Sequence, residues 1–487
     1  MAHAPSIQAA AVLGILLVAC FRPAEAQTFQ FNNIPVPASF SLTTHYIFYV
    51  DSGKDALTPF PSLATVEYQF LSFQKSDSAE PPKDYTSLEV SLIPHDSFWE
   101  LVSRDHFCAS ADNVIDKRAQ QSCRLTLVNP TKRNLTAEGV RIQGVPYASG
   151  NEAIKSWRYT IPKSGKYVLT LTNCGTFSNA TISGSVSVMS AHGYLPANEL
   201  NTMRLFGWLS AAHLVVLLVW LAGALRYLRE LLPVHWGILA VAAVCFAEST
   251  ISRMEYWDWN ATGARGSLLT VMSALSHALK FALSWRLLLL FPVGQGVELR
   301  APGTKAQLAF LAVAGVFMGQ SSLWRLLASF RHSHALDASL LVMAGLPGAL
   351  IHVGMFAWTM WALSGAIAHL KQEQGMLAGT FKRARSVVVI GAALSVLVSL
   401  LQIADLLEEF AWEHQWLAVQ GAPQFAFMSV QIAMMWVWWP SQEMSKYGYT
   451  VQASLQDEEE ATGTVTVAPE PIGAGAEEDA EDGTVLL

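Results

Sequence analysis

Residues Met203–Leu225 read MRLFGWLSAAHLVVLLVWLAGAL, an almost wholly apolar stretch with one arginine near its start. About 20 such residues form a helix long enough to cross the ~30 Å hydrocarbon core of a bilayer. Six further apolar runs follow it, at His235–Met254, Ser267–Phe291, Lys305–Leu326, Ala338–Ile367, Ser386–Leu406 and Ala422–Trp439. The sequence therefore predicts a membrane α-helical domain of seven helices at residues 198–441. We expect a break or kink in the fifth helix at Gly345-Leu-Pro347.

The composition supports a membrane protein, because 52% of the residues are hydrophobic and only 14% are charged. Soluble globular domains carry roughly 25% charged residues. The net charge of -7 arises largely in the acidic C-terminal segment. The sequence has no basic face or stripe, which argues against nucleic acid as a partner.

Ahead of the helices, residues 27–197 alternate between polar and apolar with period two. Such segments, rich in Val, Ile, Tyr and Thr and separated by Gly- and Pro-containing turns, are typical of strands in an antiparallel β-sandwich. We predict strands at His45–Val50, Thr65–Phe70, Ser87–Ile93, Arg124–Val128, Trp157–Ile161, Tyr167–Thr172 and Thr181–Val188.

Residues 1–26 are predicted to be a cleaved signal peptide. The apolar run Ala9–Phe21 is too short to span a bilayer, and small residues at Ala24 and Ala26 suit signal peptidase. An uncleaved anchor is the alternative. A cleaved signal would place the sandwich in the lumen, and the concentration of basic residues at Lys382–Arg385 between the fifth and sixth helices then agrees with the positive-inside rule.

Two kinds of covalent modification are expected in a luminal domain. Glycosylation sequons occur at Asn134, Asn179 and Asn260. Three cysteines, Cys108, Cys123 and Cys174, allow one disulfide in that oxidising compartment. We favour Cys108 with Cys123 because the loop between them is short, but the sequence leaves the pairing open.

Polar side chains within the apolar runs are candidates for function, because an unpaired charge is costly in lipid. Glu248 lies in the second run, and His277 and Lys280 lie three residues apart in the third. At helical spacing they are expected at similar depths and to form a polar cluster. We favour an interhelical pair that fixes packing; the alternative is a group that lines a water- or lipid-filled cavity.

Other polar and aromatic residues are expected at the membrane interface. Asp405, near the end of the sixth run, is expected to reach the interface by snorkelling. Trp436, Trp438 and Trp439 are expected to form an interfacial aromatic anchor.

The junction of the two domains resembles a known family. The shared features are the strand Tyr167–Cys174, Gly193-Tyr-Leu-Pro-Ala197, Trp220, Leu232-Pro-Val-His235, Glu248, Glu255-Tyr256, Asn260-Ala-Thr-Gly263, Lys280, Arg286 and Trp439-Pro440-Ser441. This pattern is similar to seven-helix proteins with Golgi-dynamics-type luminal domains, the group that includes lung seven-transmembrane receptors and Wntless, and most of all to the transmembrane protein 87 branch.

The resemblance implies a Golgi and endosomal multi-pass membrane protein of the trafficking pathway, acting in endosome-to-trans-Golgi transport or as a receptor for lipid-linked cargo. It implies a cavity open to lipid, so membrane lipids and luminal protein cargo are expected partners. A cation channel or mechanosensor component is the alternative. A signalling receptor ranks lower, because the third and seventh helices lack the motifs of G-protein-coupled receptors. No catalytic spacing occurs, so we expect neither enzymatic activity nor a cofactor.

The C-terminal segment, residues 442–487, is acidic and of low complexity, and is predicted to be disordered in the cytosol. Its last residues place Asp482 four positions before the pair Leu486 and Leu487. This arrangement resembles a dileucine sorting signal, so clathrin adaptors are expected partners.

Overall fold

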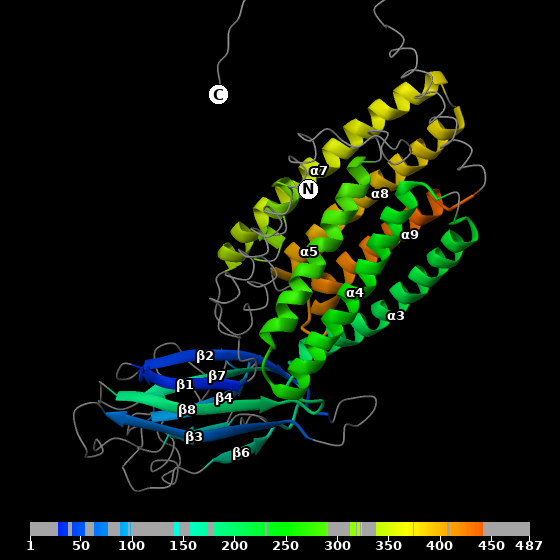
Figure 1. Ribbon diagram of the computed structural model, residues 1–487. Coiled ribbons are helices and arrows are strands. Elements are labelled where there is room, and N and C mark those ends of the chain that lie inside the picture. The colour runs from blue at the N-terminus through cyan, green and yellow to red at the C-terminus, as the bar shows by residue number, and fades with distance from the viewer. Residues whose placement is uncertain are drawn as a thin grey trace, which may run out of the picture.

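The computed structural model describes two bodies, a β-sandwich and a helical bundle (Figure 1). The described residues are 28–37, 41–53, 63–75, 88–95, 98, 141–145, 156–173, 180–228, 231–290, 312–317, 319–321, 323, 338–373, 375–406 and 410–441.

The sandwich consists of two four-stranded antiparallel sheets, with strand orders β1-β8-β3-β6 and β2-β7-β4-β5. Residues from both sheets meet in one hydrophobic core, in which Val66, Leu92 and Leu169 are almost fully buried. The strands are β1 (Thr28–Pro35), β2 (Ser41–Val50), β3 (Thr65–Lys75), β4 (Leu88–Pro94), β5 (Arg141–Gly144), β6 (Trp157–Thr160), β7 (Gly165–Asn173) and β8 (Ala180–Met189).

Six of the predicted strands are present, whereas β1 and β5 were missed and Arg124–Val128 lies outside the described residues. Strand β1 lacks regular alternation because its pairing with β8 shifts between Phe31 and Ile34. Asn33 has a φ of 53° at this bulge, a conformation that asparagine tolerates better than most residues. A bulge interrupts period two, so this strand gives a weak sequence signal.

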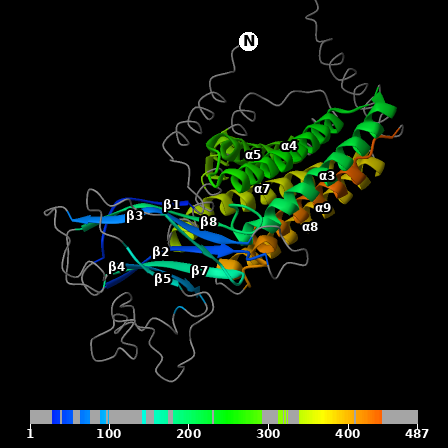
Figure 2. The same ribbon diagram turned by 90° about the horizontal axis from the view of Figure 1, so that it is seen from below.

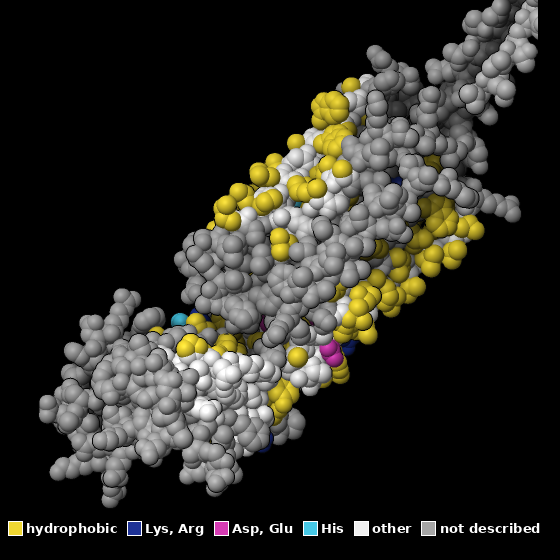
Figure 3. Space-filling view, turned by 60° about the vertical axis from the view of Figure 1, so that its left-hand side comes forward, with side chains coloured by type: hydrophobic (Ala, Val, Ile, Leu, Met, Phe, Trp, Pro, Cys, Tyr) yellow, Lys and Arg dark blue, Asp and Glu magenta, His cyan; other side chains and the backbone are white. Residues whose placement is uncertain are grey.

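The bundle follows directly. Its elements are α3 (Ala197–Arg226), α4 (Pro233–Thr262), α5 (Ser267–Leu290), α7 (Ala338–Glu373), α8 (Gly375–Leu406), and a π-helix η4 (Leu417–Gly421) continuous with α9 (Ala422–Val437). Residues 312–317 are helical within the predicted fourth span. Among the described residues, five helices are long and apolar enough to cross a membrane. The space-filling view shows many hydrophobic side chains on the flank of these helices (Figure 3). Among them, Val215, Val353 and Val396 are each at least 60% exposed.

Two predictions about the helices were wrong in part. Helix α7 runs through Pro347 without a break. Trp436 is exposed, as an interfacial anchor requires, but Trp438 is fully buried and packs edge-on against Phe381 with ring centroids 5.9 Å apart. Positions two residues apart near a helix end point in different directions, so Trp436 faces lipid while Trp438 faces the bundle.

The sandwich lies against one end of the bundle, where α3 and α5 begin and α4 ends (Figures 1 and 2). We call this the sandwich end and the opposite one the far end. The chain passes from β8 to α3 through residues 190–196. Tyr49 of β2 also packs near Trp412, with ring centroids 6.0 Å apart.

Candidate functional site

A polar network in the bundle brings together the three intramembrane residues expected from the sequence. Glu248 of α4 accepts hydrogen bonds from His277 Nδ1 and Lys280 Nζ, both on α5, each at 2.7 Å. The carboxylate and the ammonium are almost fully buried. Their opposite charges compensate each other where lipid and protein exclude water.

Gln424 of α9 completes this network. Its Nε2 donates to Glu248 Oε1 at 3.1 Å, and its Oε1 accepts from Lys280 Nζ at 3.0 Å. The ammonium also lies 4.6 Å from the ring centroid of Phe427, within the range of a cation–π contact. Three helices are thus linked by one set of charge-assisted hydrogen bonds.

Sequence reasoning missed Gln424. An amide near the start of a predicted membrane helix is a signal that could have drawn attention, since polar groups within spans usually find partners. Its partner Glu248, however, lies 176 residues away in the sequence. Only the packing of α9 against α4 and α5 reveals the contact.

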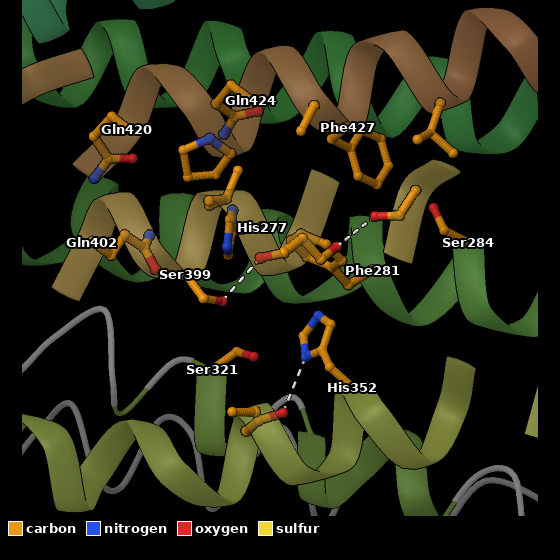
Figure 4. A pocket seen from close by; sticks show the side chains of 18 of the residues that line it. His277, Phe281, Ser284, Ser321, His352, Ser399, Gln402, Gln420, Gln424 and Phe427 are labelled. Carbon is orange, nitrogen blue, oxygen red and sulfur yellow. Dashed lines mark hydrogen bonds between the residues drawn. The ribbon is translucent and has the colours of Figure 1, made fainter. Parts of the chain in front are cut away.

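A cavity of about 1120 Å³ lies beside the network. Its wall is formed by residues of α3, α4, α5, α7, α8 and the η4–α9 helix, together with Arg265, Phe317, Gln320 and Ser321. His277 and Gln424 reach it, whereas Glu248 and Lys280 lie behind the wall. Figure 4 shows His277, Phe281, Gln424 and Phe427 on one side of this space and His352 on the other. The network therefore fits both interpretations of these residues, because it links helices and also contributes side chains to a cavity wall.

The wall changes in character along the bundle. Toward the sandwich end it carries amides and hydroxyls, such as those of Gln402, Ser399 and Gln420. Toward the far end it is largely apolar, with residues including Trp285, Leu288, Phe356, Met360, Val388 and Met434. This gradient suits an amphiphilic ligand, whose polar and apolar parts need different surroundings.

Charged side chains line the cavity at its sandwich end. Arg265 lies 4.0 Å from the Glu255 carboxylate and 3.9 Å from the ring centroid of Trp259. Asp405 also lines the cavity and is only 2% exposed, so the expectation that it snorkels to the interface was wrong. The residue lies on the inner face of α8, and facing inward decides its environment more than nearness to a helix end does.

Asn260 joins the bundle to the sandwich. Its Nδ2 donates to the His192 carbonyl at 2.9 Å, and its Oδ1 accepts from the Leu195 amide at 3.1 Å. The backbone carbonyl of Asn260 accepts from Tyr194 N at 3.1 Å. At Gly193, a Cβ would lie 2.7 Å from that carbonyl oxygen, so only glycine fits there. Glycosylation of Asn260 stays a prediction, and the side chain has a structural role besides.

The remaining predicted positions lie outside the described residues: Asn134, Asn179, Cys108, Cys123, Asp482, Leu486 and Leu487. Within the described ranges, Cys245 is a buried free thiol. Those same ranges contain no group of three or more His, Cys, Asp or Glu side chains arranged to hold a metal ion.

Comparison with known proteins decides the family. The model of the GOST seven transmembrane domain matches residues 201–445, half of the chain, from the first helix to just beyond α9. The chain belongs to this family. The match covers the helices that form the network and the cavity, so both features belong to a GOST bundle.

Individual relatives support this assignment to the family. The chain is 23% identical to Transmembrane protein 87A of Xenopus tropicalis over 288 residues, 57% of this chain and 51% of that protein. It is 21% identical to Membrane protein PTM1 of Saccharomyces cerevisiae (81% and 73% covered) and 21% identical to Transmembrane protein 87B of Mus musculus (77% and 67% covered). The expected kinship with the transmembrane protein 87 branch is confirmed. The alignment spans only about half the length of the frog relative.

Proposed function

We propose that this multi-pass membrane protein acts in Golgi and endosomal trafficking, as a receptor that holds a lipid or the lipid part of a cargo in its bundle cavity. In this proposal the sandwich faces the lumen, where it contacts protein cargo, and the C-terminal segment faces the cytosol, where clathrin adaptors bind it. The proposal includes no enzymatic activity.

The cavity is the observation that carries this proposal. A space of about 1120 Å³ with a polar end and an apolar end is of the size and character that ligand sites have. The apolar end would accept an acyl chain, because burial of each CH₂ group contributes about 0.8 kcal/mol. The sandwich stands at the polar end, so a cargo attached to the lipid would meet it there.

The lipid part of the proposal is tested by filling the cavity. Ala392 of α8 lines it, whereas the next residue, Ala393, is exposed and does not. We expect Ala392→Trp to abolish co-purification of lipid with the protein, and Ala393→Trp to retain it, as measured by mass spectrometry. Protein that purifies without lipid in the unmodified form would contradict the proposal.

The trafficking part is tested by localisation. A tagged full-length chain is expected in the Golgi, and replacement of Leu486 and Leu487 by Ala is expected to shift it toward the cell surface. Residence of the unmodified chain at the plasma membrane would count against the proposal.

A cation channel is the second candidate, favoured by the carboxylate of Glu248 inside the bundle. Lys280 and His277 both contact that carboxylate, and a buried ammonium repels passing cations. We therefore expect no ionic current across bilayers that contain the reconstituted protein. Currents that change in Glu248→Gln would favour the channel instead.

A further inference from the structure

Three glutamines mark one face of the η4–α9 helix. Gln420, Gln424 and Gln431 are separated by four and seven residues, which places them above one another on a helix, and all three line the cavity. Amides are uncommon inside membrane helices because each needs hydrogen-bond partners. Gln424 has its partners in the polar network, which leaves the other two to be explained.

Uncharged polar groups also line the cavity on the elements that face this helix. Gln402 and Ser399 of α8 line the sandwich half of the cavity, as do Gln320 and Ser321. Figure 4 shows Gln420, Gln402, Ser399 and Ser321 around the same space, contributed by three separate segments. Side-chain amides and hydroxyls both donate and accept hydrogen bonds, as the hydroxyls of a sugar do.

The charges in the wall do not suit a phosphate. The basic side chains among its described residues are Arg265, His277 and His352. Arg265 lies beside the Glu255 carboxylate and over Trp259, and His277 contacts the Glu248 carboxylate. His352 Nδ1 is hydrogen bonded to the Gly348 carbonyl.

Acidic side chains in the same wall are Glu199, Glu255 and Asp405. A phosphate would therefore meet carboxylates and basic groups already engaged with other partners. An uncharged head avoids the repulsion and the desolvation of charge that a phosphate would bring.

Gln431 gives a second and independent indication. It is only 7% exposed, and neither its Oε1 nor its Nε2 has a hydrogen-bond partner in the described part of the chain. Both polar atoms are buried beneath the cavity surface. A buried amide without partners is costly, so rotation of this side chain toward a ligand group that both donates and accepts would be favourable. Gln431 lies eleven residues beyond Gln420, about 16 Å farther along the helix, where the wall turns apolar. A hydrogen-bonding group between the head and the tail of a lipid would reach this depth.

We propose that the cavity is selective for a lipid with an uncharged, hydroxyl-rich head and an amide at the start of its tail, the chemistry of a glycosylated ceramide. The head lies among Gln402, Ser399 and Gln420, the linking amide meets Gln431, and the tail occupies the apolar far end. This inference rests on the proposed function, since it names the lipid that the cavity would hold.

The test is competition between defined lipids for the purified full-length protein, read by native mass spectrometry. The probes are N-palmitoyl glucosylceramide, dipalmitoyl phosphatidylcholine and dipalmitoyl phosphatidylethanolamine. We expect the glucosylceramide to be retained about tenfold more strongly than either phospholipid. The double variant Gln402→Leu/Gln420→Leu should remove that preference, because two ordinary hydrogen bonds account for about a tenfold change.

A control and a second variant separate binding from folding. Ser429 lies on α9, is exposed and is not part of the cavity wall, so Ser429→Leu should leave the preference unchanged. Gln431→Leu should weaken glucosylceramide binding while raising the melting temperature of the lipid-free protein, because leucine removes two unpartnered polar atoms. A purely structural role for Gln431 would lower that melting temperature, which would overturn its part in the site.

The outcomes distinguish this inference from the function on which it rests. Equal or stronger retention of the phospholipids, unchanged in the Gln402→Leu/Gln420→Leu variant, would overturn the selectivity and leave a lipid-binding receptor standing. Failure to retain any of the three lipids would overturn both.

Discussion

The interiors of the sandwich and of the bundle are built on different principles. The sandwich core is a cluster of hydrophobic side chains from both sheets, and the buried Glu89 lies on the other face of β4 from the core residue Val90. The bundle encloses the Glu248–Lys280 ion pair and a large cavity. In water, apolar burial drives folding, whereas helices in lipid gain little from it and associate through packing and hydrogen bonds. The bundle can therefore keep an open space that the sandwich could not.

The largest effect is expected from breaking the polar network. Glu248→Ala leaves the Lys280 ammonium buried without its carboxylate, which should cost about 3–5 kcal/mol. Lys280→Met should cost a similar amount by leaving the carboxylate uncompensated. The double variant Glu248→Ala/Lys280→Met should recover much of the loss, because no buried charge is then unpaired.

These three variants are compared by thermal unfolding of the purified protein in detergent. A melting temperature unchanged in Glu248→Ala would show that the network does not stabilise the bundle. Losses that simply add in the double variant would show that the two charges are not coupled.

A slightly smaller effect is expected in the sandwich core. Leu169 of β7 is 1% exposed, and Leu169→Ala should destabilise the sandwich by about 2–5 kcal/mol through lost burial and a residual cavity. Leu63, which is 48% exposed, supplies the control Leu63→Ala with little expected change. Hydrogen exchange should quicken in β4 and β7 while the α3–α5 helices keep their protection. Equal loosening of those helices would mean that the two interiors do not fold independently.

The junction should respond more modestly. Ala at Gly193 would need a φ of +132° and would press its Cβ against Asn260, so Gly193→Ala should cost about 1–3 kcal/mol, mostly in the docking of the two domains. Gly144→Ala is the matched control, since a Cβ there meets nothing within 4 Å. Faster hydrogen exchange at residues 192–195 in Gly193→Ala alone would support this role. Equal behaviour of the two variants would argue against a tight junction.

The smallest effect is a pH dependence at the same junction. His192, whose Nδ1 lies 3.8 Å from the Asp51 carboxylate, is the largest influence on the pKa of Asp51 and lowers it below its ordinary value of 3.8. Because the unfolded chain then binds more protons, this stabilisation is present above about pH 3.8 and is lost as the pH falls through the lowered pKa. Asp51→Asn should therefore flatten the decline of the melting temperature below pH 4. If the melting temperature of Asp51→Asn fell as steeply as that of the unmodified protein, groups other than Asp51 would cause the pH dependence.

Long, regular segments were predictable from their patterns alone. The apolar runs that became α3, α4 and α5 are readable because a helix in lipid must have both length and apolar character. The alternation of β7 and β8 is readable because each strand has a face toward one core. Strand β1 escaped prediction because its bulge breaks period two. The helix through Pro347 kept its continuity although proline lacks an amide hydrogen, because a membrane helix tolerates proline where neighbouring groups satisfy the freed carbonyl.

The candidate site was only partly within reach of the sequence. Spacing and depth sufficed to associate Glu248 with His277 and Lys280, since helical geometry relates residues on adjacent helices of known direction. Gln424 and the inward orientation of Asp405 did not follow, because the rotation of each helix about its axis depends on how its neighbours pack.

The sequence by itself determined that this chain crosses the membrane several times, that a β-sandwich precedes the helices, and which charged groups need partners inside the bundle. These properties depend on local composition and on the short periods of the hydrophobic pattern, which are independent of distant segments. Only the tertiary structure decided that Asn260 joins the domains, that Gln424 completes the network, and that a line of glutamines faces a cavity. Each of these depends on side chains from helices far apart in the sequence, and their positions relative to one another are set by packing across the whole bundle.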